Sequence, residues 1–346
     1  MFLYIFVRHP VLGKNIINGI KGEVSREKMD VTIWFMAITY AAELTLLCIG
    51  YTLTYVTAKI PNFAHGTYAG FGIYVSYTLA KFFGINPYLG FPLAFVIGGI
   101  ISVVVFKLVI STLTKMGSGS IVLTIATLAI QIFLGAILYI YAYTFISFFK
   151  QYATAFLLKE YDFKIGDISG IFFVSIGISV VTVIILHYLL TRTKMGIAMR
   201  ATAEDTELAS VLGINIVNVQ LFSWFLTGGL ACLAGAMIPF WFQSSPATGS
   251  AIITSIMAGS LLGGFDNIYG AIVGGFTIGM AEIMLTLGGQ IVVGNWFGEY
   301  RPLIPMFFLI AILLIEPRGI AGIWERIGAR RIKSSLKKPE EKEDEK

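Results

Sequence analysis

The segment Arg192–Ile216, "RTKMGIAMRATAEDTELASVLGINI", differs from everything around it. It places charges of both signs within about 25 residues, and a long apolar run lies on each side of it. Because charged side chains are costly inside a bilayer, such a segment is expected to lie outside the hydrocarbon, between two spans. Its pattern predicts a short amphipathic helix, which needs a surface to lie against.

The composition of the whole chain supports that interpretation. Of its 346 residues 56% are hydrophobic and 13% are charged, and the mean hydropathy is +0.81. Soluble domains carry about 25% charged residues. We therefore predict an all-α integral membrane protein, a polytopic helical bundle in the plasma membrane. The net charge of +5 forms no basic stripe with interleaved aromatic residues, which argues against nucleic acid as a partner.

The apolar runs predict about nine transmembrane helices, with a range of eight to ten. The predicted spans are 31–57, 64–83, 88–110, 120–145, 168–190, 218–242, 250–264, 269–290 and 302–316. The seventh is short and rich in Gly and Ser, so it either enters only half of the membrane or packs inside the bundle. Small residues four apart predict close helix packing. These pairs are Ala231/Gly235, Gly270/Gly274 and Gly275/Gly279.

The distribution of Lys and Arg predicts that the loop at 191–219 and the C-terminus are cytoplasmic. With that orientation fifteen basic residues lie inside, nine of them at 318–346, and five lie outside. The tail at 319–346 is charged and lacks apolar periodicity, so it is predicted to be a disordered cytoplasmic segment.

Residues 1–30 form an N-terminal extension of the transmembrane domain, which we place at 31–318. The five basic residues of the extension conflict with the exterior location that nine spans imply. Three explanations are open. The extension is an interfacial helix, one span is re-entrant, or the chain starts at Met29.

Within the charged segment the sequence predicts one helix over residues 203–212, with Thr202 as its N-cap. Asp205 stands at the third helical position, a capping-box spacing, and Gly213 follows as a residue that can adopt the left-handed conformation. The acidic residues of the first two turns are Glu204, Asp205 and Glu207, and the apolar side consists of Ala201, Leu208, Ala209, Val211 and Leu212. A helix bound to lipid headgroups is expected to be basic on its polar face. This face is acidic, so a groove on a protein partner suits it better than the membrane surface.

Four segments resemble motifs of one family. Residues 194–215, "KMGIAMRATAEDTELASVLGIN", resemble the cytoplasmic loop by which permeases of the branched-chain amino-acid ABC importer family dock on their ATPase subunit. The other three segments are "IPNFAHGTYAGFGIYVSY" (60–77), "AGSLLGGFDNIYGAIVGGFTIGMAEIML" (258–285) and "IEPRGIAG" (315–322). All four occur along the chain in the order that the family shows. The resemblance extends from about residue 35 to residue 322. Residues 1–28 lie outside it, and Glu43, Phe265 and Asp266 depart from the family pattern.

The resemblance implies an ABC importer permease fold that carries branched-chain or similar hydrophobic amino acids, with no enzymatic activity and no cofactor or metal. It implies partners, namely separate ATPase subunits, a paralogous permease or a second copy of the chain, and an extracytoplasmic solute-binding protein, all within membrane lipid. The chain contains no Walker A pattern G-x-x-x-x-G-K-[ST], so any ATPase is another chain. The residues expected to couple the loop to the ATPase are Arg200, Glu204, Asp205, Ala209, Leu212 and Gly213.

Four polar residues are candidates for the translocation path. Asn62 and His65 lie in a stretch interrupted by Pro and Gly, and broken helices at membrane depth commonly line a pathway. An ordinary interfacial turn is the alternative. Glu43 and Glu282 are carboxylates inside apolar runs, which usually face the bundle interior or a cavity. The alternative is that either carboxyl group is protonated, or that its hydrogen bonds are satisfied by neighbouring hydroxyl and backbone groups.

Other functions stay open on sequence grounds. The same fold can import urea, an amide, a sugar or a nucleoside. The two membrane carboxylates also support an ion-coupled secondary transporter. An intramembrane enzyme fares worst, because His9, His65 and His187 are scattered and no nucleophile–base pair or metal-ligand spacing is present.

Overall fold

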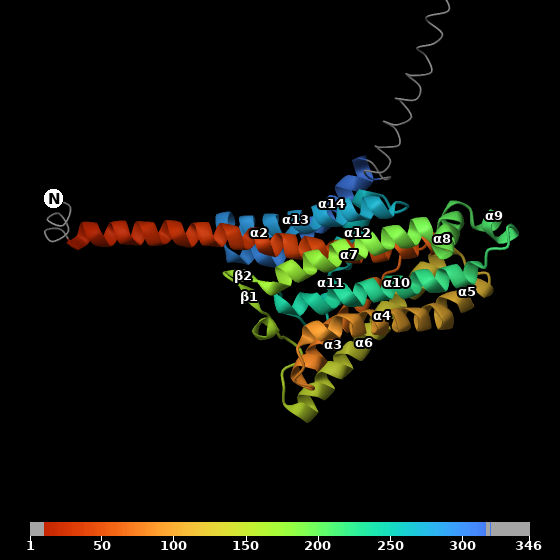
Figure 1. Ribbon diagram of the computed structural model, residues 1–346, viewed down its shortest axis with the longest axis horizontal. Helices are drawn as coiled ribbons and strands as arrows, with labels where there is room; N and C mark the ends of the chain where they lie inside the picture. The colour runs from red at the N-terminus through yellow and green to blue at the C-terminus, as the bar shows by residue number, and fades with distance from the viewer. Residues whose placement is uncertain (1–9, 316–318, 320–346) are drawn as a thin grey trace, which may run out of the picture.

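The computed structural model describes the backbone of residues 10–315 and of Gly319, and the side chains from Val31 onward. It is a bundle of helices with one short β-hairpin (Figure 1). The first half contains α2 (Pro10–Ala58), α3 (His65–Lys81), α4 (Phe91–Val105), the π-helical turn η2 (Phe106–Ile110), α5 (Ser111–Lys115) and α6 (Ser120–Phe149). The second half contains α7 (Gly170–Arg192), α8 (Lys194–Glu204), α9 (Thr206–Val211), α10 (Ile216–Met237), α11 (Thr248–Ala251), α12 (Ile253–Gly263), α13 (Ile268–Val293) and α14 (Leu303–Ile315).

Short elements connect these helices. Four are 3₁₀ helices: η1 (Pro87–Gly90), η3 (Lys159–Tyr161), η4 (Ile238–Phe240) and η5 (Asn295–Tyr300). The antiparallel hairpin joins β1 (Lys164–Ile165) to β2 (Ile168–Ser169) just before α7.

Each predicted apolar segment forms a helix near its expected position, but nine full crossings are not confirmed. In the described part of the chain six helices are long and apolar enough to cross a membrane. They are Val31–Ala58, Pro87–Lys115, Ser120–Phe149, Gly170–Arg192, Ile216–Phe240 and Ile268–Val293. The segments 248–263 and 303–315 form shorter apolar helices, and α3 has 17 residues. Helix α12 packs against α2, α13 and α14, which fits the predicted short segment inside the bundle.

The first helix is longer than the predicted first span. It starts at Pro10 and continues without a break to Ala58, so its N-terminal part extends beyond the rest of the bundle (Figure 1). The boundary placed at residue 31 therefore coincides with no break in the helix. Residues 1–9 of the predicted extension and 320–346 of the predicted tail lie outside the described residues.

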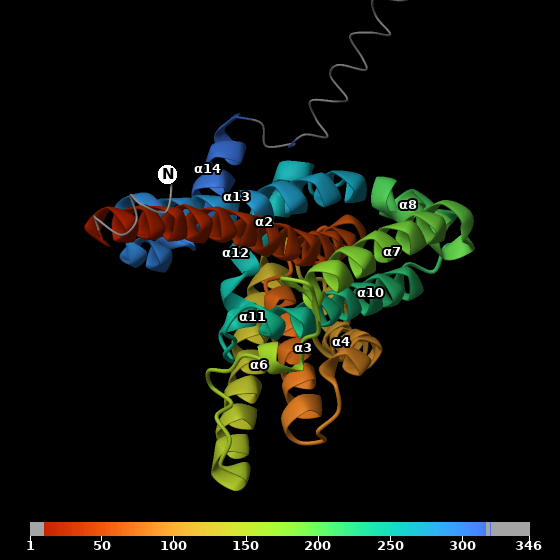
Figure 2. The ribbon, with the colours of Figure 1, turned by 60° about the vertical axis from the view of Figure 1, so that its left-hand side comes forward.

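Glycines allow α2 and α13 to lie close together (Figure 2). A Cβ atom on Gly279 would lie 2.6 Å from the Cα of Ala41, and one on Gly275 would lie 2.9 Å from the Cα of Thr45. Separations this short are not sustained between carbon atoms, so larger residues would force the two helices apart. The predicted packing role of Gly275 and Gly279 is confirmed.

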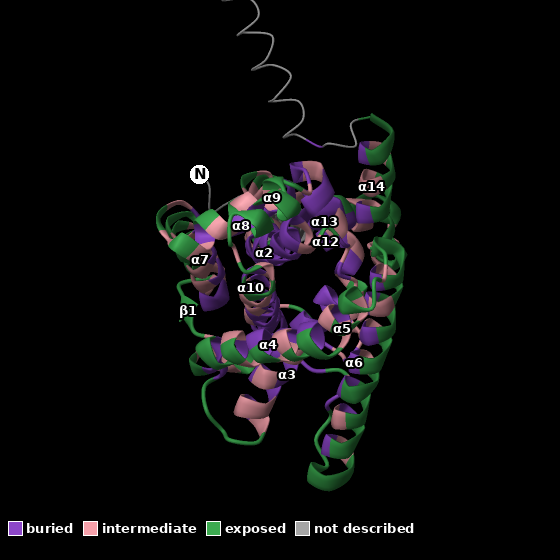
Figure 3. Ribbon diagram, turned by 90° about the vertical axis from the view of Figure 1, so that its right-hand side faces the viewer, coloured by how far each residue is buried: buried purple, intermediate pink, exposed green. Residues whose placement is uncertain are grey.

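Helix α10 is the most enclosed of the long helices and packs against α2, α3 and α4. A Cβ atom on Gly235 would lie 1.9 Å from the carbonyl oxygen of Ala69 on α3. On the α2 side, the hydroxyl of Thr54 donates to that of Thr227 at 2.7 Å. By contrast, α6 and α7 carry many exposed residues (Figure 3), and their exposed apolar side chains suit contact with lipid.

The α8–α9 segment lies at the end of the bundle where α2 finishes. Leu53 near the end of α2 shares a buried apolar cluster with Met199 of α8. Lys59 follows α2 and pairs with Asp266 before α13 at 2.7 Å. Gly319 lies against this same end, since a Cβ atom on it would be 2.4 Å from the carbonyl oxygen of Leu261. We call this the loop end of the molecule and the opposite side the far end.

Candidate functional site

The charged loop contains two helices rather than the single one that the sequence predicts. The chain bends at Asp205, between α8 and α9. The Asp205 carboxylate accepts hydrogen bonds from the backbone N–H groups of Glu207 and Leu208, both at 2.9 Å, so it caps α9. The prediction that Thr202 caps a helix over 203–212 is wrong. Thr202 is buried inside α8, and its hydroxyl donates to the carbonyl four residues earlier.

The end of the loop agrees with its prediction. Gly213 has a φ of 86°, the left-handed conformation that favours glycine. Its N–H donates to the carbonyl of Ser210 at 3.0 Å, and the N–H of Ile214 donates to that of Ala209 at 3.1 Å. These bonds satisfy carbonyl groups that α9 would otherwise leave open.

The start of the loop depends on two residues that sequence reasoning missed. The hydroxyl of Thr193 accepts a hydrogen bond from the N–H of Gly196 at 3.1 Å and caps α8. A Cβ atom on Gly196 would lie 2.1 Å from the carbonyl oxygen of Leu189 and 2.5 Å from the Cα of Leu190. Only glycine therefore lets α8 turn this tightly against α7. The available signal was a threonine three residues before a glycine, directly after an apolar run.

The tip of the loop presents apolar side chains outward. Val211 is 83% exposed and Leu212 is 72% exposed, while Ala209 is buried. The predicted apolar side is thus divided: Ala209 is buried, whereas Val211 and Leu212 form an exposed apolar surface, which we call the knob. Arg200 and Glu204 on α8 are exposed, and Asp205 caps α9. An exposed apolar surface on a loop that also carries exposed charged residues is typical of a docking surface.

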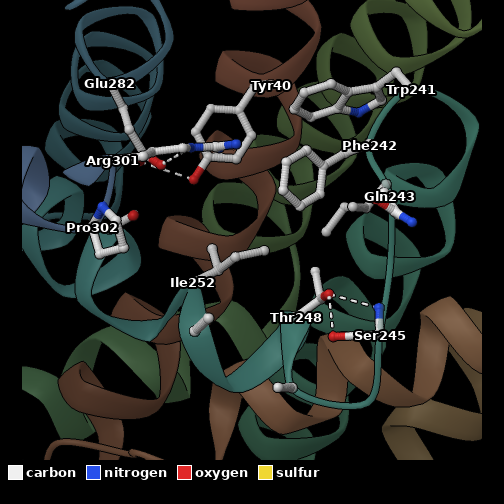
Figure 4. Close-up of a pocket in the computed structure, with 14 residues that line it drawn as sticks. Tyr40, Trp241, Phe242, Gln243, Ser245, Thr248, Ile252, Glu282, Arg301 and Pro302 are labelled. Carbon is white, nitrogen blue, oxygen red and sulfur yellow. Dashed lines mark hydrogen bonds and ion pairs between the residues drawn. The ribbon is translucent and has the colours of Figure 1, made fainter. Parts of the chain in front are cut away.

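A cavity of about 330 Å³ lies in the half of the bundle away from the loop (Figure 4). Its walls combine aromatic, aliphatic, hydroxyl and charged side chains, among them Tyr40, Trp241, Phe242, Ser245, Thr248, Ile252, Ser255, Glu282 and Arg301. Glu282 stands 14 residues after the start of α13, which corresponds to about 21 Å from the loop end of that helix. The cavity is therefore nearer to the far end.

Glu282 is one of the predicted membrane carboxylates, and it is almost completely buried. It accepts hydrogen bonds from Nε of Arg301 at 2.7 Å and from the hydroxyl of Tyr40 at 3.0 Å. The Arg301 guanidinium also lies over the rings of Tyr40 and Phe242, 4.7 and 5.0 Å from their centroids. Burial acts to lower the pKa of Arg301, but its interactions with Tyr40 and Glu282 outweigh it and raise that pKa. The Arg301 guanidinium is thus charged, largely shielded from water and packed against two aromatic rings.

Glu43 is the second predicted carboxylate, and the structure brings it to the same region. It is fully buried, and both of its carboxylate oxygens accept from Nε1 of Trp241, at 2.9 and 3.0 Å. The Trp241 ring packs edge-on against Tyr40, with the centroids 5.7 Å apart. Glu43 therefore holds the indole that forms one wall of the cavity.

Asn62 and His65 lie elsewhere, in a buried polar cluster closer to the loop end. Nε2 of His65 lies 2.9 Å from the carbonyl oxygen of Leu47, and the ring packs against Tyr51. Among the described residues, the side-chain amide of Asn62 and Nδ1 of His65 have no hydrogen-bond partner. Neither residue lines the cavity of Glu282. Unpaired buried polar groups of this kind are where ordered water or a polar solute is expected.

The two family departures, Phe265 and Asp266, lie at the loop end. The ring of Phe265 packs against Tyr51 and Tyr55, with centroids 5.9 and 4.7 Å apart. Asp266 forms the exposed ion pair with Lys59. Phe265 and Asp266 thus both contact the C-terminal part of α2 or the residue that follows it.

Comparison of the sequence with known proteins points to one family. A family model described as "Branched-chain amino acid transport system / permease component" matches residues 33–315. The chain is 41% identical over 292 residues to "Probable branched-chain amino acid transport permease protein LivH" of Methanocaldococcus jannaschii, covering 84% of this chain and 92% of that protein. It is 27% identical over 298 residues to "High-affinity branched-chain amino acid transport system permease protein BraD" of Pseudomonas aeruginosa, covering 82% and 93%. Among solved structures, "PsaBC from Streptococcus pneumoniae in complex with Fab" has 16% identity, covers 83% of this chain and 92% of that chain, and has a TM-score of 0.48.

Proposed function

The chain belongs to the family of branched-chain amino acid transport permease components, and from that premise we propose that it carries branched-chain or similar hydrophobic amino acids across the plasma membrane. As a permease subunit of an ABC importer, it is a multi-pass membrane protein and not an enzyme. The observation that carries the proposal is the family match over residues 33–315. The cavity supports it, because apolar walls beside charged groups suit a solute with an aliphatic side chain and a charged backbone.

We propose that the α8–α9 loop docks on an ATPase subunit at the cytoplasmic face. The exposed knob of Val211 and Leu212 fills an apolar groove on the partner, and Arg200 and Glu204 form its charged rim. Asp205 and Gly213 fix the shape of the loop, and the tight turn at Gly196 makes it move with α7. Closure of the ATPases on ATP then pushes the loop and shifts the helices against one another. Gly319 lies at the same end, which we propose to be cytoplasmic.

The proposed translocation path follows one strip of α2. Tyr40, Glu43, Leu47 and Tyr51 are spaced three or four residues apart, so they share one face of the helix. This strip connects the cavity with the polar cluster of His65 over about 12 Å, at 1.5 Å per residue from residue 43 to residue 51. A paralogous permease or a second copy of the chain completes the path within the lipid, and a solute-binding protein delivers the solute at the far end.

Reconstitution tests both the substrate and the coupling. The permease is placed in vesicles with its ATPases, its second permease subunit and its binding protein, and accumulation of radiolabelled L-leucine is measured. We expect uptake that requires ATP and stops when the ATPase is omitted. Uptake driven by an ion gradient without ATPase, or uptake of urea, a sugar or a nucleoside in place of amino acids, would contradict the proposal.

Within the same system two loop variants test the docking surface. Leu212→Asp places a charge on the exposed knob, and Gly213→Val strains the backbone where φ is 86°. Both are expected to reduce ATPase co-purification and leucine-stimulated ATP hydrolysis by at least about tenfold, which corresponds to about 1.4 kcal/mol of lost docking energy. The control is Leu89→Asp at the far end, a leucine that is 74% exposed. Normal coupled hydrolysis in Leu212→Asp would exclude the knob as the docking surface.

A further inference from the structure

The Glu282–Arg301 pair has unused binding capacity inside the cavity. A guanidinium carries five N–H donors, and Arg301 uses its Nε–H on Glu282, which leaves the terminal Nη groups available for another acceptor. Oxygen Oε1 of Glu282 accepts that bond, and Oε2 accepts from Tyr40. Each carboxylate oxygen has two acceptor positions, so each of these oxygens can accept another donor.

The pair is also held in a fixed geometry. The guanidinium lies over the rings of Tyr40 and Phe242, and the Arg301 side chain is only 18% exposed. Stacking restricts the orientation of the planar guanidinium, so little order is lost when it binds a carboxylate. Shielding from water also strengthens its charge-assisted hydrogen bonds.

We infer that this cavity is a transient binding site for the zwitterionic backbone of an α-amino acid, with Arg301 holding the carboxylate, Glu282 holding the ammonium, and Trp241, Phe242 and Ile252 contacting the aliphatic side chain. The inference rests on the proposed function and specifies the recognition chemistry of the path. Figure 4 shows these groups around one cavity: Arg301 and Glu282 on one side, and Trp241 and Phe242 on the other.

Charge complementarity favours a zwitterion over other small solutes. A lone anion at Arg301 is repelled by Glu282, and a lone cation at Glu282 is repelled by Arg301. A zwitterion offers each member of the pair its opposite charge. The volume of about 330 Å³ lies within the range of small-molecule pockets, so an amino acid with a branched side chain can enter.

The same pair keeps binding weak. The solute competes with an ion pair that is already formed, so the gain in free energy is smaller than for an unpaired arginine. Weak binding is what a path requires, since a tightly held solute would not move on. Glu43 acts as a positioning residue, because it fixes the Trp241 wall through its two hydrogen bonds.

The test is saturation-transfer difference NMR on the intact importer complex in nanodiscs, without the binding protein, using L-leucine as the probe. This method detects weak binding, and it can compare leucine with its singly charged analogues 3-methylbutylamine and 4-methylpentanoate. For the wild type we expect a leucine signal, and each analogue should bind at least about tenfold more weakly because it leaves one buried charge unmatched. Equal binding of either analogue would overturn the inference.

Variants assign the site to the two charges. Arg301→Gln is expected to weaken leucine binding by at least about tenfold, through loss of a charge-assisted contact. Arg301→Lys keeps a positive charge beside Glu282 but loses the planar guanidinium, so it should fold and bind leucine more weakly than the wild type and more tightly than Arg301→Gln. Wild-type leucine affinity in Arg301→Gln would show that the pair is only structural, and would overturn the inference. The control is Lys81→Gln, which removes a lysine that pairs with Glu160 outside this cavity.

Uptake measured in parallel separates this inference from the proposed function. If wild-type vesicles accumulate leucine with ATP while Arg301→Gln retains its leucine affinity, the site is wrong and the proposed function stands. If wild-type vesicles do not accumulate leucine, the proposed function fails whatever the NMR shows.

Discussion

The α8–α9 loop takes its shape from hydrogen bonds between near neighbours, whereas the cavity is held by residues far apart in the chain. Asp205 caps α9 through residues two and three positions ahead, and Thr193 accepts from a residue three positions ahead. In the cavity, Tyr40 and Glu282 are 242 residues apart and Glu43 and Trp241 are 198 apart. The loop bonds are largely exposed and the cavity bonds are buried, so a lost bond should cost little stability in the loop and much in the cavity.

The largest effect on stability is expected for Trp241→Phe. The change removes the donor to both oxygens of Glu43 and leaves a fully buried carboxylate without this partner. We expect a loss of about 3 kcal/mol in the free energy of unfolding, the upper end of the scale for a buried polar group left without its hydrogen-bond partner. The measurement is unfolding of the permease in detergent, followed by tertiary-structure signals.

Trp224→Phe provides the matched control for that prediction. Trp224 is fully buried, and among the described residues its Nε1 has no hydrogen-bond partner. The same substitution there removes a similar volume and no hydrogen bond. If Trp241→Phe and Trp224→Phe lower the free energy of unfolding by the same amount, the hydrogen bonds to Glu43 contribute nothing to stability. The cavity would then not differ from the loop in the way proposed here.

The second prediction concerns Gly196→Val, at the base of the loop. The new side chain would meet the backbone of Leu189 and Leu190, which cannot move aside as a flexible side chain can. Overpacking of this kind costs about 1–3 kcal/mol. Because α8 must shift, leucine-stimulated ATP hydrolysis should fall by about tenfold or more. The free energy of unfolding should decrease less than in Trp241→Phe.

Gly135→Val on α6 is the control, since a Cβ atom there would meet nothing within 4 Å. That variant should retain coupled hydrolysis. Normal coupling in Gly196→Val would show that the tight turn does not set the position of the loop. If Gly196→Val lowered the free energy of unfolding as much as Trp241→Phe, the base of the loop would contribute to global stability as the cavity does. The two regions would then not differ in this respect.

The same contrast explains what the sequence could predict. Gly213 was correctly predicted because its signal is local, a glycine at the end of an amphipathic run. The N-cap at Thr202 was wrong because a threonine inside a helix can bond backward to the preceding turn, and the spacing does not distinguish the two uses. Asp205 carries the cap instead and breaks the helix in two.

The cavity was predictable only in part. Glu43 and Glu282 are conspicuous as carboxylates in apolar runs, which indicated an enclosed role. Their partners are not conspicuous: Arg301 reads as an ordinary loop charge, and Trp241 as one aromatic among many. No local pattern joins residues about 200 positions apart, so Asn62 and His65 were grouped with the two carboxylates although they lie in another cluster. The helices themselves were predictable because each carries its own apolar run, whereas crossing depends on length and packing as well.

The smallest effect is expected for Asp205→Ala. Loss of an N-cap costs about 1 kcal/mol, which corresponds to roughly fivefold in a local opening equilibrium. Hydrogen exchange at the amides of Glu207 and Leu208 should therefore accelerate by about fivefold, while global unfolding is unchanged, because α9 frays without disturbing the buried helices. Glu204→Ala is the matched control: it removes an exposed acid one residue earlier that takes no part in the cap. Equal acceleration in both variants would mean that acidic charge near the start of α9, rather than the two hydrogen bonds of Asp205, stabilises the helix. A fall in global stability would show that α9 is coupled to the core, and the loop could then no longer be regarded as locally built.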